Sequence, residues 1–203
     1  MIGIVNTGFG NTKSINNIYF EKGIDSILIN EPSDFKKINK IILPGIGSFD
    51  TLTRKLNDLN FTEILSELVL IKEMPILGIC IGMHIFFESS NEGKSNGFGW
   101  IKGNVKRIDS TNLRLPHMGW NRVHLNINNN LFNDIQDGSF FYFLHSFGGI
   151  LNTEDSSHIA YTNYGKKIIS SVNYKNIYGV QFHPEKSHSS GIKLLTNFAK
   201  INA

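Results

Sequence analysis

Short apolar runs alternate with amphipathic segments through the first eighty residues. Four of these runs have the length of strands and end at turn-forming residues: Ile2–Val5, Ser26–Ile29, Lys40–Leu43 and Pro75–Ile79. Between them, apolar residues recur near helical spacing from about Asn11 to Lys22 and from about Phe49 to Lys72. This alternation predicts βαβ units and a parallel sheet that is covered on both faces.

The pattern in the second half of the chain predicts strands separated by turns. The predicted strands are Gly103–Ile108, Asn121–Asn126, Ser139–His145, His158–Thr162, Ile168–Tyr174 and Ile177–Phe182. A last helix is predicted from about Ser189 to Ile201, and no repeat or Pro/Ser-rich linker divides the chain. The sequence thus predicts a single α/β domain over residues 1–203, with a mostly parallel central sheet flanked by helices and a β-rich second half.

Composition and charge exclude several classes of protein. The 203 residues are 40% apolar and 18% charged, and 20 Lys+Arg against 17 Asp+Glu give a net charge of only +3. This excess is too weak to indicate a nucleic-acid partner, and no apolar run approaches the roughly 18 residues of a membrane span. The N-terminus lacks the basic segment of a signal peptide, so a cytoplasmic protein is expected. A single cysteine, Cys80, excludes an internal disulfide and a zinc site of several thiolates.

Two glycines flank that cysteine in the sequence Gly78-Ile79-Cys80-Ile81-Gly82. Small flanking residues let a strand turn sharply and expose a nucleophile, an arrangement called the nucleophile elbow. Residues Met83–Glu88 are expected to continue as a helix, whose N-terminus would favour a thiolate. A cysteine after a strand is also commonly a small core residue, so both interpretations stay open on this segment alone.

A histidine and a carboxylate follow the last predicted strand, in Phe182-His183-Pro184-Glu185-Lys186-Ser187. Pro184 disfavours helical backbone at His183, so the segment is expected to be extended, with side chains i and i+2 on the same side. His183 would act as a base and Glu185 would orient its imidazole. The segment could instead be a surface loop, but together with Cys80 it indicates nucleophilic acyl chemistry.

A pair of glycines follows the third predicted strand, in Leu43-Pro44-Gly45-Ile46-Gly47. The segment could be a simple turn. In a parallel sheet, however, it would lie at the carboxyl edge where Cys80 also emerges, and its backbone N–H groups could face an oxyanion.

These segments resemble the class I, triad-type glutamine amidotransferases over nearly the whole chain. Within that family, the chain is most similar to the glutaminase subunits of imidazole glycerol phosphate synthases. The motifs that carry the resemblance are GFGN near the N-terminus, LPGIGSF at 43–49, PILGICIGMHIFFESS at 75–90, EG at 92–93, PHMGWN at 116–121, FYFLHS at 141–146 and YGVQFHPEKS at 178–187.

The resemblance implies hydrolysis of glutamine by Cys80, His183 and Glu185 through a γ-glutamyl thioester, with no metal or organic cofactor. It implies that oxyanion and glutamine contacts come from Gly45, Ile46, Gly47, Ile81, His84, Ser146 and Phe147. It also implies a heterodimer with a cyclase subunit that receives the ammonia in histidine biosynthesis. The interface residues implied are Asn11, Met118, Trp120, Asn121 and Tyr142. On this basis the chain is expected among the hydrolases and, through the synthase, the lyases.

Three departures from the family pattern bear on substrate and partner. Asn6-Thr7 stands where the family usually has Asp-Tyr, and His84 stands where it usually has Gln, although a histidine can still donate a hydrogen bond. GFGW at 97–100 and PEKSHSSG at 184–191 look closer to a paralogous branch that supplies ammonia for amino-sugar synthesis in bacterial surface polysaccharides.

Two other classes of protein stay open on the sequence. One is a general cysteine hydrolase of small esters or peptides, and the other is a non-catalytic regulatory subunit that retains the fold. The remaining histidines are expected to be structural or exposed residues: His117, His124, His145, His158 and His188.

Overall fold

The computed structural model describes residues 1–109, 113–125, 130–152 and 159–201, and most of its strands form one mixed sheet in the order β2-β1-β3-β4-β12-β11-β10-β7-β8. The parallel half contains β1 (Ile2–Val5), β2 (Ser26–Ile29), β3 (Lys40–Gly45), β4 (Ile76–Cys80) and β12 (Ile177–Val180). The antiparallel half contains β7 (His117–Leu125), β8 (Ser139–His145), β10 (Ile159–Tyr164) and β11 (Lys166–Tyr174). The predicted α/β fold with a β-rich second half is confirmed.

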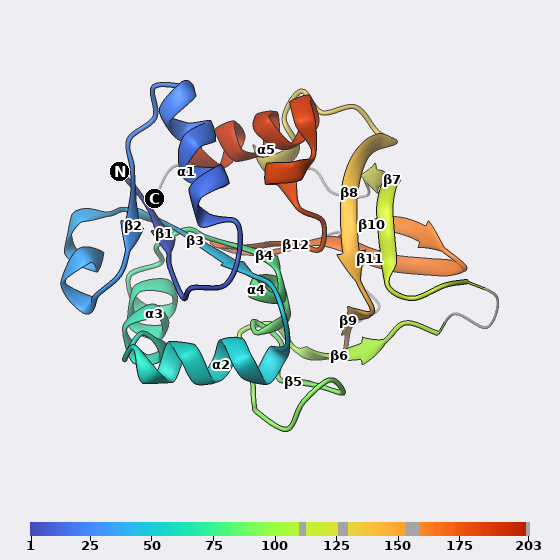
Figure 1. Ribbon diagram of the computed structural model, residues 1–203, viewed down its shortest axis with the longest axis horizontal. Helices are drawn as coiled ribbons and strands as arrows, with labels where there is room; N and C mark the ends of the chain where they lie inside the picture. Colours follow the sequence, from blue (N-terminus) through green and yellow to red (C-terminus); the bar gives the residue numbers. More distant parts are fainter. Residues whose placement is uncertain (110–112, 126–129, 153–158, 202–203) are drawn as a thin grey trace.

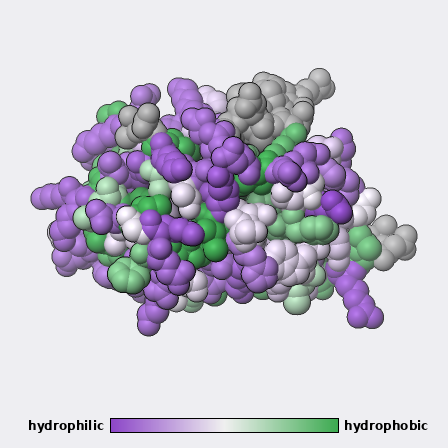
Figure 2. All heavy atoms as spheres, turned by 90° about the horizontal axis from the view of Figure 1, so that it is seen from above, coloured by the Kyte–Doolittle hydropathy of each residue, from purple (hydrophilic) through white to green (hydrophobic). Residues whose placement is uncertain are grey.

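Helices cover both faces of the parallel half (Figure 1). Helices α1 (Thr12–Glu21) and α5 (His188–Lys200) lie on one face, and α2 (Phe49–Asp58) and α3 (Thr62–Ser66) lie on the other. Every residue of β1, β3, β4 and β12 is therefore buried, as the near-continuous apolar runs predict. Seen from above, over α1 and α5, the surface is mostly hydrophilic, and hydrophobic residues show in smaller areas between hydrophilic ones (Figure 2).

A second, small sheet in the order β5-β6-β9 lies outside the main one. It consists of β5 (Ser89–Ser90), β6 (Gly103–Arg107) and β9 (Phe147–Leu151). The sequence pattern missed β5 and β9. In β9, a Cβ at Gly149 would lie 2.5 Å from the ring of Phe87, so glycine permits a close approach at the cost of strand propensity.

Two helix predictions are corrected by the structure. The helix expected over residues 49–72 is interrupted, because Asn60 has a left-handed backbone with φ 57° that ends α2; α3 and a short π-helical segment, η2 (Glu67–Ile71), follow. The helix expected over Met83–Glu88 is wrong. Helix α4 spans only Ile81–His84, and the chain then turns so that the backbone N–H of Glu88 donates to Gly103 of the small sheet.

Other boundaries differ by a few residues. Strand β3 continues through Pro44 and Gly45, where a turn was expected, and β7 begins four residues earlier than predicted. Three short 3₁₀ segments were not predicted: η1 (Pro32–Lys37), η3 (Asn130–Phe132) and η4 (Pro184–Lys186). The predicted ends of strands at Asn126 and His158 lie outside the described residues.

The register of the parallel half brings three segments to one edge. Gly45 at the end of β3 pairs with Cys80 at the end of β4, and Val180 at the end of β12 pairs with Ile79. The loop after β3, the cysteine and the segment that carries His183 therefore leave the sheet side by side. This carboxyl edge is where open α/β sheets place their sites.

Candidate active site

Cys80 occupies the sharp turn between β4 and α4. Its backbone has φ 55° and ψ −112°, a conformation that side-chain-bearing residues rarely adopt. A Cβ at Gly82 would lie 1.8 Å from the carbonyl oxygen of Leu43, and one at Gly78 would lie 2.6 Å from the carbonyl oxygen of Gly82. Only glycine fits at these two positions, so the Gly-x-Cys-x-Gly spacing produces the strained geometry expected of an elbow.

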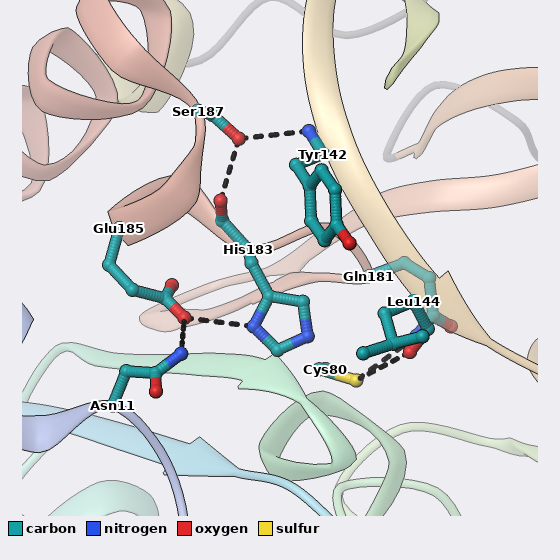
Figure 3. Close-up of polar contacts among 8 residues, drawn as sticks. All are labelled: Asn11, Cys80, Tyr142, Leu144, Gln181, His183, Glu185 and Ser187. Carbon is teal, nitrogen blue, oxygen red and sulfur yellow. Dashed lines mark hydrogen bonds and ion pairs between the residues drawn. The ribbon is translucent and has the colours of Figure 1, made fainter. Parts of the chain in front are cut away.

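The imidazole of His183 lies between Glu185 and Cys80 (Figure 3). Nδ1 of His183 donates to Oε1 of Glu185 at 2.9 Å, which leaves Nε2 for the sulfur side. The prediction that the two side chains meet is confirmed, but its geometric reason is wrong. His183 is extended, with φ −99° and ψ 95°, whereas Glu185 lies in the 3₁₀ turn η4 and folds back.

Charge is concentrated in this buried group. Burial acts to lower the pKa of His183, but hydrogen bonds and negative charge from Cys80 and Glu185 outweigh it, so the pKa is raised above its usual value. Burial acts to raise the pKa of Glu185, yet His183 and the amide of Asn11 hold that pKa below its usual value. The arrangement therefore favours an imidazolium beside a carboxylate.

Asn11 contacts the acid of the site. Its Nδ2 donates to Oε1 of Glu185 at 2.7 Å, so its side chain supports the carboxylate from the loop before α1. The resemblance implied an interface role for Asn11, and no local pattern connects it with a residue 174 positions away.

The backbone of His183 is held by β8. Its N–H donates to the carbonyl oxygen of Tyr142 at 2.8 Å. Oγ of Ser187 donates to the carbonyl oxygen of His183 at 2.6 Å and accepts from the N–H of Tyr142 at 3.0 Å (Figure 3). These three bonds fix the histidine to a strand of the antiparallel half.

A pocket of about 270 Å³ opens at Cys80. This is slightly below the roughly 300 Å³ at which small-molecule sites commonly begin, and it suits a substrate the size of an amino acid. Its lining includes most of the predicted site residues: Ile46, Gly47, Cys80, Ile81, His84, Ser146, Phe147 and His183. Gly45 is not among the lining residues; a Cβ there would lie 2.8 Å from Leu52 and 3.0 Å from the backbone of Gly82, so this glycine permits packing beneath the elbow.

Four lining residues were missed by sequence reasoning: Glu92, Pro116, Leu144 and His145. Glu92 supplies a carboxylate whose Oε2 accepts from the N–H of Phe49 at 2.9 Å. Burial raises the pKa of Glu92, and the nearby charge of Asp50 acts in the same direction. The Glu-Gly motif at 92–93 was noticed only as part of a resemblance, and the tertiary structure brings it to the pocket.

His84 is fully buried, and burial lowers its pKa to about 4. Nε2 of His84 lies 2.6 Å from Oε1 of Gln181, an atom that can only accept, so the proton of the neutral imidazole is on Nε2. The hydrogen bond that His84 was expected to donate is thus taken by Gln181. Nδ1 is an acceptor without a partner among the described residues.

His145, which lines the pocket, forms a hydrogen-bonded pair with His117. Nδ1 of His145 lies 2.8 Å from the carbonyl oxygen of Phe147, and its Nε2 lies 3.0 Å from Nδ1 of His117. Burial lowers the pKa to about 4 for His117 and to about 3 for His145, so both are neutral. Asn121 donates to Nε2 of His117 at 3.2 Å and to the carbonyl oxygen of Asn163 at 3.0 Å.

The remaining predicted interface residues lie on β7 and β8. Met118 is 62% exposed and Trp120 is 45% exposed. Trp120 pairs across the strands with Tyr142 and stacks on His188 at 4.9 Å. Because side chains alternate along a strand, Asn121 points to the opposite face of β7 from Trp120.

The described residues contain no group of three or more His, Cys, Asp or Glu arranged to hold a metal ion. Within the same described ranges, no helix is long and apolar enough to cross a membrane.

The fold and the site together define the class of the protein. The mixed sheet carries a strained cysteine, a histidine and an acid beside a pocket the size of an amino acid. The model of the "Glutamine amidotransferase class-I" family matches residues 4–201. The structure is similar to a crystal structure titled as a glutamine amidotransferase, with a TM-score of 0.74, 13% identity, and coverage of 98% of this chain and 99% of that one. It is also similar to the structure of PurLQS from Thermotoga maritima, with a TM-score of 0.71, 18% identity, and coverage of 98% and 97%.

Two relatives allow a narrower family to be assigned to the chain. The chain is 44% identical to imidazole glycerol phosphate synthase subunit HisH 2 of Methanococcus maripaludis, over 98% of this chain and 99% of that protein. It is 42% identical to the HisH subunit of Leptospira interrogans, over 99% and 100%. The chain belongs to the class-I glutamine amidotransferases and, within them, to the family of these HisH subunits.

Proposed function

We propose that this chain is the glutaminase subunit of an imidazole glycerol phosphate synthase, in which it hydrolyses glutamine to glutamate and ammonia. The observation that carries the proposal is the pocket, where a cysteine on an elbow, a histidine paired with a buried carboxylate, and the separate carboxylate of Glu92 meet. The relatives of 42–44% identity supply the synthase context. The lyase class suggested by the resemblance is wrong for this chain, because a glutaminase subunit hydrolyses an amide.

In this proposal Cys80 attacks the side-chain amide carbon of glutamine. The loop at Ile46 and Gly47 and the N-terminus of α4 at Ile81 supply backbone N–H groups to the oxyanion; losing one such donor typically costs roughly 3–4 kcal/mol of transition-state stabilisation. His183 gives its proton to the departing ammonia, which leaves a γ-glutamyl thioester on Cys80. His183 then takes a proton from water as the thioester is hydrolysed, and glutamate and the free thiol result.

The pocket offers complementary charge to an amino acid. The carboxylate of Glu92 can accept from the α-ammonium group of glutamine. Ser146 and Phe147 line the same pocket and are proposed as further contacts to glutamine.

The proposal includes a heterodimer with a cyclase subunit and a cytoplasmic location for the complex. The exposed side chains of Met118 and Trp120, beside Tyr142, are the proposed docking residues, since large apolar side chains exposed together commonly mark interaction sites.

The test measures glutamate release by the full chain in three mixtures: alone, with an imidazole glycerol phosphate cyclase subunit, and with that subunit and its nucleotide substrate. We expect turnover to rise on adding the subunit and to rise again with the nucleotide. A response only to a sugar amidotransferase would move the assignment to the surface-polysaccharide branch. Turnover of simple esters but not of glutamine would indicate a general cysteine hydrolase.

A further inference from the structure

Gln181 lies directly behind Cys80 and His84, and no motif had marked it as a site residue. It follows β12, two residues before His183, and its side chain is fully buried. Its Nε2 lies 3.8 Å from Sγ of Cys80, and its Oε1 lies 2.6 Å from Nε2 of His84. The described residues that line the pocket do not include Gln181, so its amide faces the sulfur from the protein side.

Hydrogen-bonding rules fix the orientation of this amide. The carbonyl oxygen of Gln181 faces the N–H of His84, so the NH₂ group must face the sulfur. A flipped amide would need the proton of His84 on Nδ1, which has no partner among the described residues, so a buried donor would be left unsatisfied. His84 therefore determines which end of Gln181 meets Cys80.

The sulfur forms different hydrogen bonds as a thiol and as a thiolate. As a thiol it donates to the carbonyl oxygen of Leu144, which lies 3.9 Å away. As a thiolate it can only accept, and the N–H of Gln181 then remains a favourable partner. In Figure 3 the imidazole of His183 and the amide of Gln181 lie to either side of the sulfur.

We propose that Gln181 is a positioning residue that stabilises the thiolate of Cys80 by donating an amide hydrogen bond, and that His84 holds this amide in the donating orientation. The inference rests on the proposed role of Cys80 as nucleophile. It also gives a function to the histidine at position 84: a long side chain that donates to Oε1 of Gln181 is required there, and a glutamine would serve as well.

Several titratable groups also surround the sulfur and influence its ionisation. They come from four different elements: His183 after β12 with Glu185 beyond it, His84 on α4, His145 on β8, and Glu92 after β5. His84 and His145 are neutral at pH 7, because burial lowers their pKa values to about 4 and about 3. Substitutions at Gln181 leave all of these groups in place.

The experiment measures the rate at which iodoacetamide alkylates the full-length chain, followed by mass spectrometry from pH 5 to pH 10. Cys80 is the only cysteine, so each modified molecule reports on this one sulfur. Gln181→Met removes the donor and keeps a long unbranched side chain. We expect the midpoint of its pH–rate profile to rise by about one pH unit, a tenfold change in the ionisation equilibrium, since hydrogen bonds to charged groups are worth that much. The plateau at high pH should match wild type, because access to the sulfur is unchanged.

Two further variants separate positioning from a general structural effect. His84→Leu should raise the midpoint of the pH–rate profile in the same way, and His84→Gln should keep the wild-type midpoint, because only glutamine can hold the amide of Gln181. Ser171→Ala is the matched control: this buried hydroxyl donates to the carbonyl oxygen of Gly179 in the same sheet, and its loss should leave the rate unchanged. If Gln181→Met does not fold, Gln181→Glu replaces it, and a larger rise in the midpoint of the pH–rate profile is expected.

Each outcome decides a separate point. A folded Gln181→Met or Gln181→Glu variant whose pH–rate profile has the wild-type midpoint overturns the inference. Glutamine turnover that persists in Cys80→Ala overturns the proposed nucleophile instead, and leaves the alkylation result standing.

Discussion

His183 and Glu185 meet because the backbone between them changes direction. Pro184 keeps His183 extended, and the 3₁₀ turn that begins at Pro184 then carries the carboxylate back to Nδ1. Asn11 holds the same carboxylate oxygen from the other side of the site. At the scale of single residues, the acid thus has two partners, and its role is to orient and charge the histidine.

Glu185→Gln is expected to lower glutamine turnover, but by less than His183→Ala. The amide can still accept from Nδ1 but no longer stabilises an imidazolium, whereas removal of the imidazole removes the base itself. The measurement is kcat for both variants in the presence of the partner subunit. Equal losses are compatible with the triad, since residues that act as a unit are non-additive; wild-type turnover in Glu185→Gln would contradict it.

At the scale of elements, the site depends on how closely β3 and the elbow approach each other. Gly45 of β3 pairs with Cys80, and Gly82 of α4 sits against the carbonyl oxygen of Leu43. The strained backbone of Cys80 is maintained by this packing, since a conformation of this kind costs about 1–3 kcal/mol and must be held by its surroundings.

Gly82→Ala is expected to reduce the free energy of unfolding by about 3 kcal/mol or more, because the new Cβ would lie 1.8 Å from a backbone oxygen that cannot move without separating β3 from α4. Gly23→Ala is the control. Gly23 has φ 66° and open space around its Cβ position, so only conformational strain of about 1 kcal/mol is expected. Urea unfolding of the two variants measures both values, and equal losses would contradict the steric account.

At the scale of the whole molecule, buried histidines link stability to pH in two directions. His84, His117 and His145 have pKa values lowered to about 4, 4 and 3, so the unfolded chain binds more protons below the usual value of 6.5. His183 has a raised pKa, so its contribution is complete below 6.5 and is lost as pH rises through its folded value. The depressed pKa of Glu185 adds stability that is lost only at acid pH.

The histidine contributions to the free energy of unfolding should therefore be greatest near pH 6.5. As the pH is lowered from 6 to 4.5, each neutral buried histidine should reduce the free energy of unfolding by up to about 1.4 kcal/mol per pH unit. His84→Gln removes one such group, so its slope should be shallower than that of wild type by about that amount. Urea unfolding at a series of pH values tests this, and identical slopes would show that His84 is protonated in the folded state.

Hydrogen bonds through Tyr142 connect the proposed docking surface with the catalytic histidine. The carbonyl oxygen of Tyr142 accepts from the N–H of His183, its N–H donates to Oγ of Ser187, and its ring lies beside Trp120. In the isolated chain we expect the loop at Gly45–Gly47 to rest with a carbonyl toward the oxyanion position, because a peptide flip beside glycine is inexpensive. Partner binding would then favour the competent loop.

Trp120→Ala is accordingly expected to reduce activation by the cyclase subunit. A 100-fold activation needs only about 2.7 kcal/mol of differential binding to the competent state, which an interface of ordinary size can supply. The measurement is the ratio of turnover with and without the subunit. Phe20→Ala is the control, since Phe20 is 82% exposed on α1, away from β7 and β8. Full activity of the chain alone would contradict the gating of the loop.

The features that could be predicted from the sequence are those that rest on local backbone requirements. Alternating apolar runs specify the parallel half of the sheet, and glycines around Cys80 specify the elbow because no other residue fits the turn. Pro184 marks the place where the histidine leaves the sheet. The interruption of the helix at Asn60 also had a local signal, since asparagine commonly ends helices in the left-handed conformation.

The distant residues that complete the site could not be predicted from the sequence, because packing of the folded chain brings them together. Asn11 reaches Glu185, Glu92 reaches the pocket, and Gln181 meets both Cys80 and His84 through the register of β4 and β12. Such contacts join positions up to 174 residues apart, and no local pattern encodes them. The physical reason is that hydrogen bonds between side chains depend on strand register and packing, which the whole sheet sets at once.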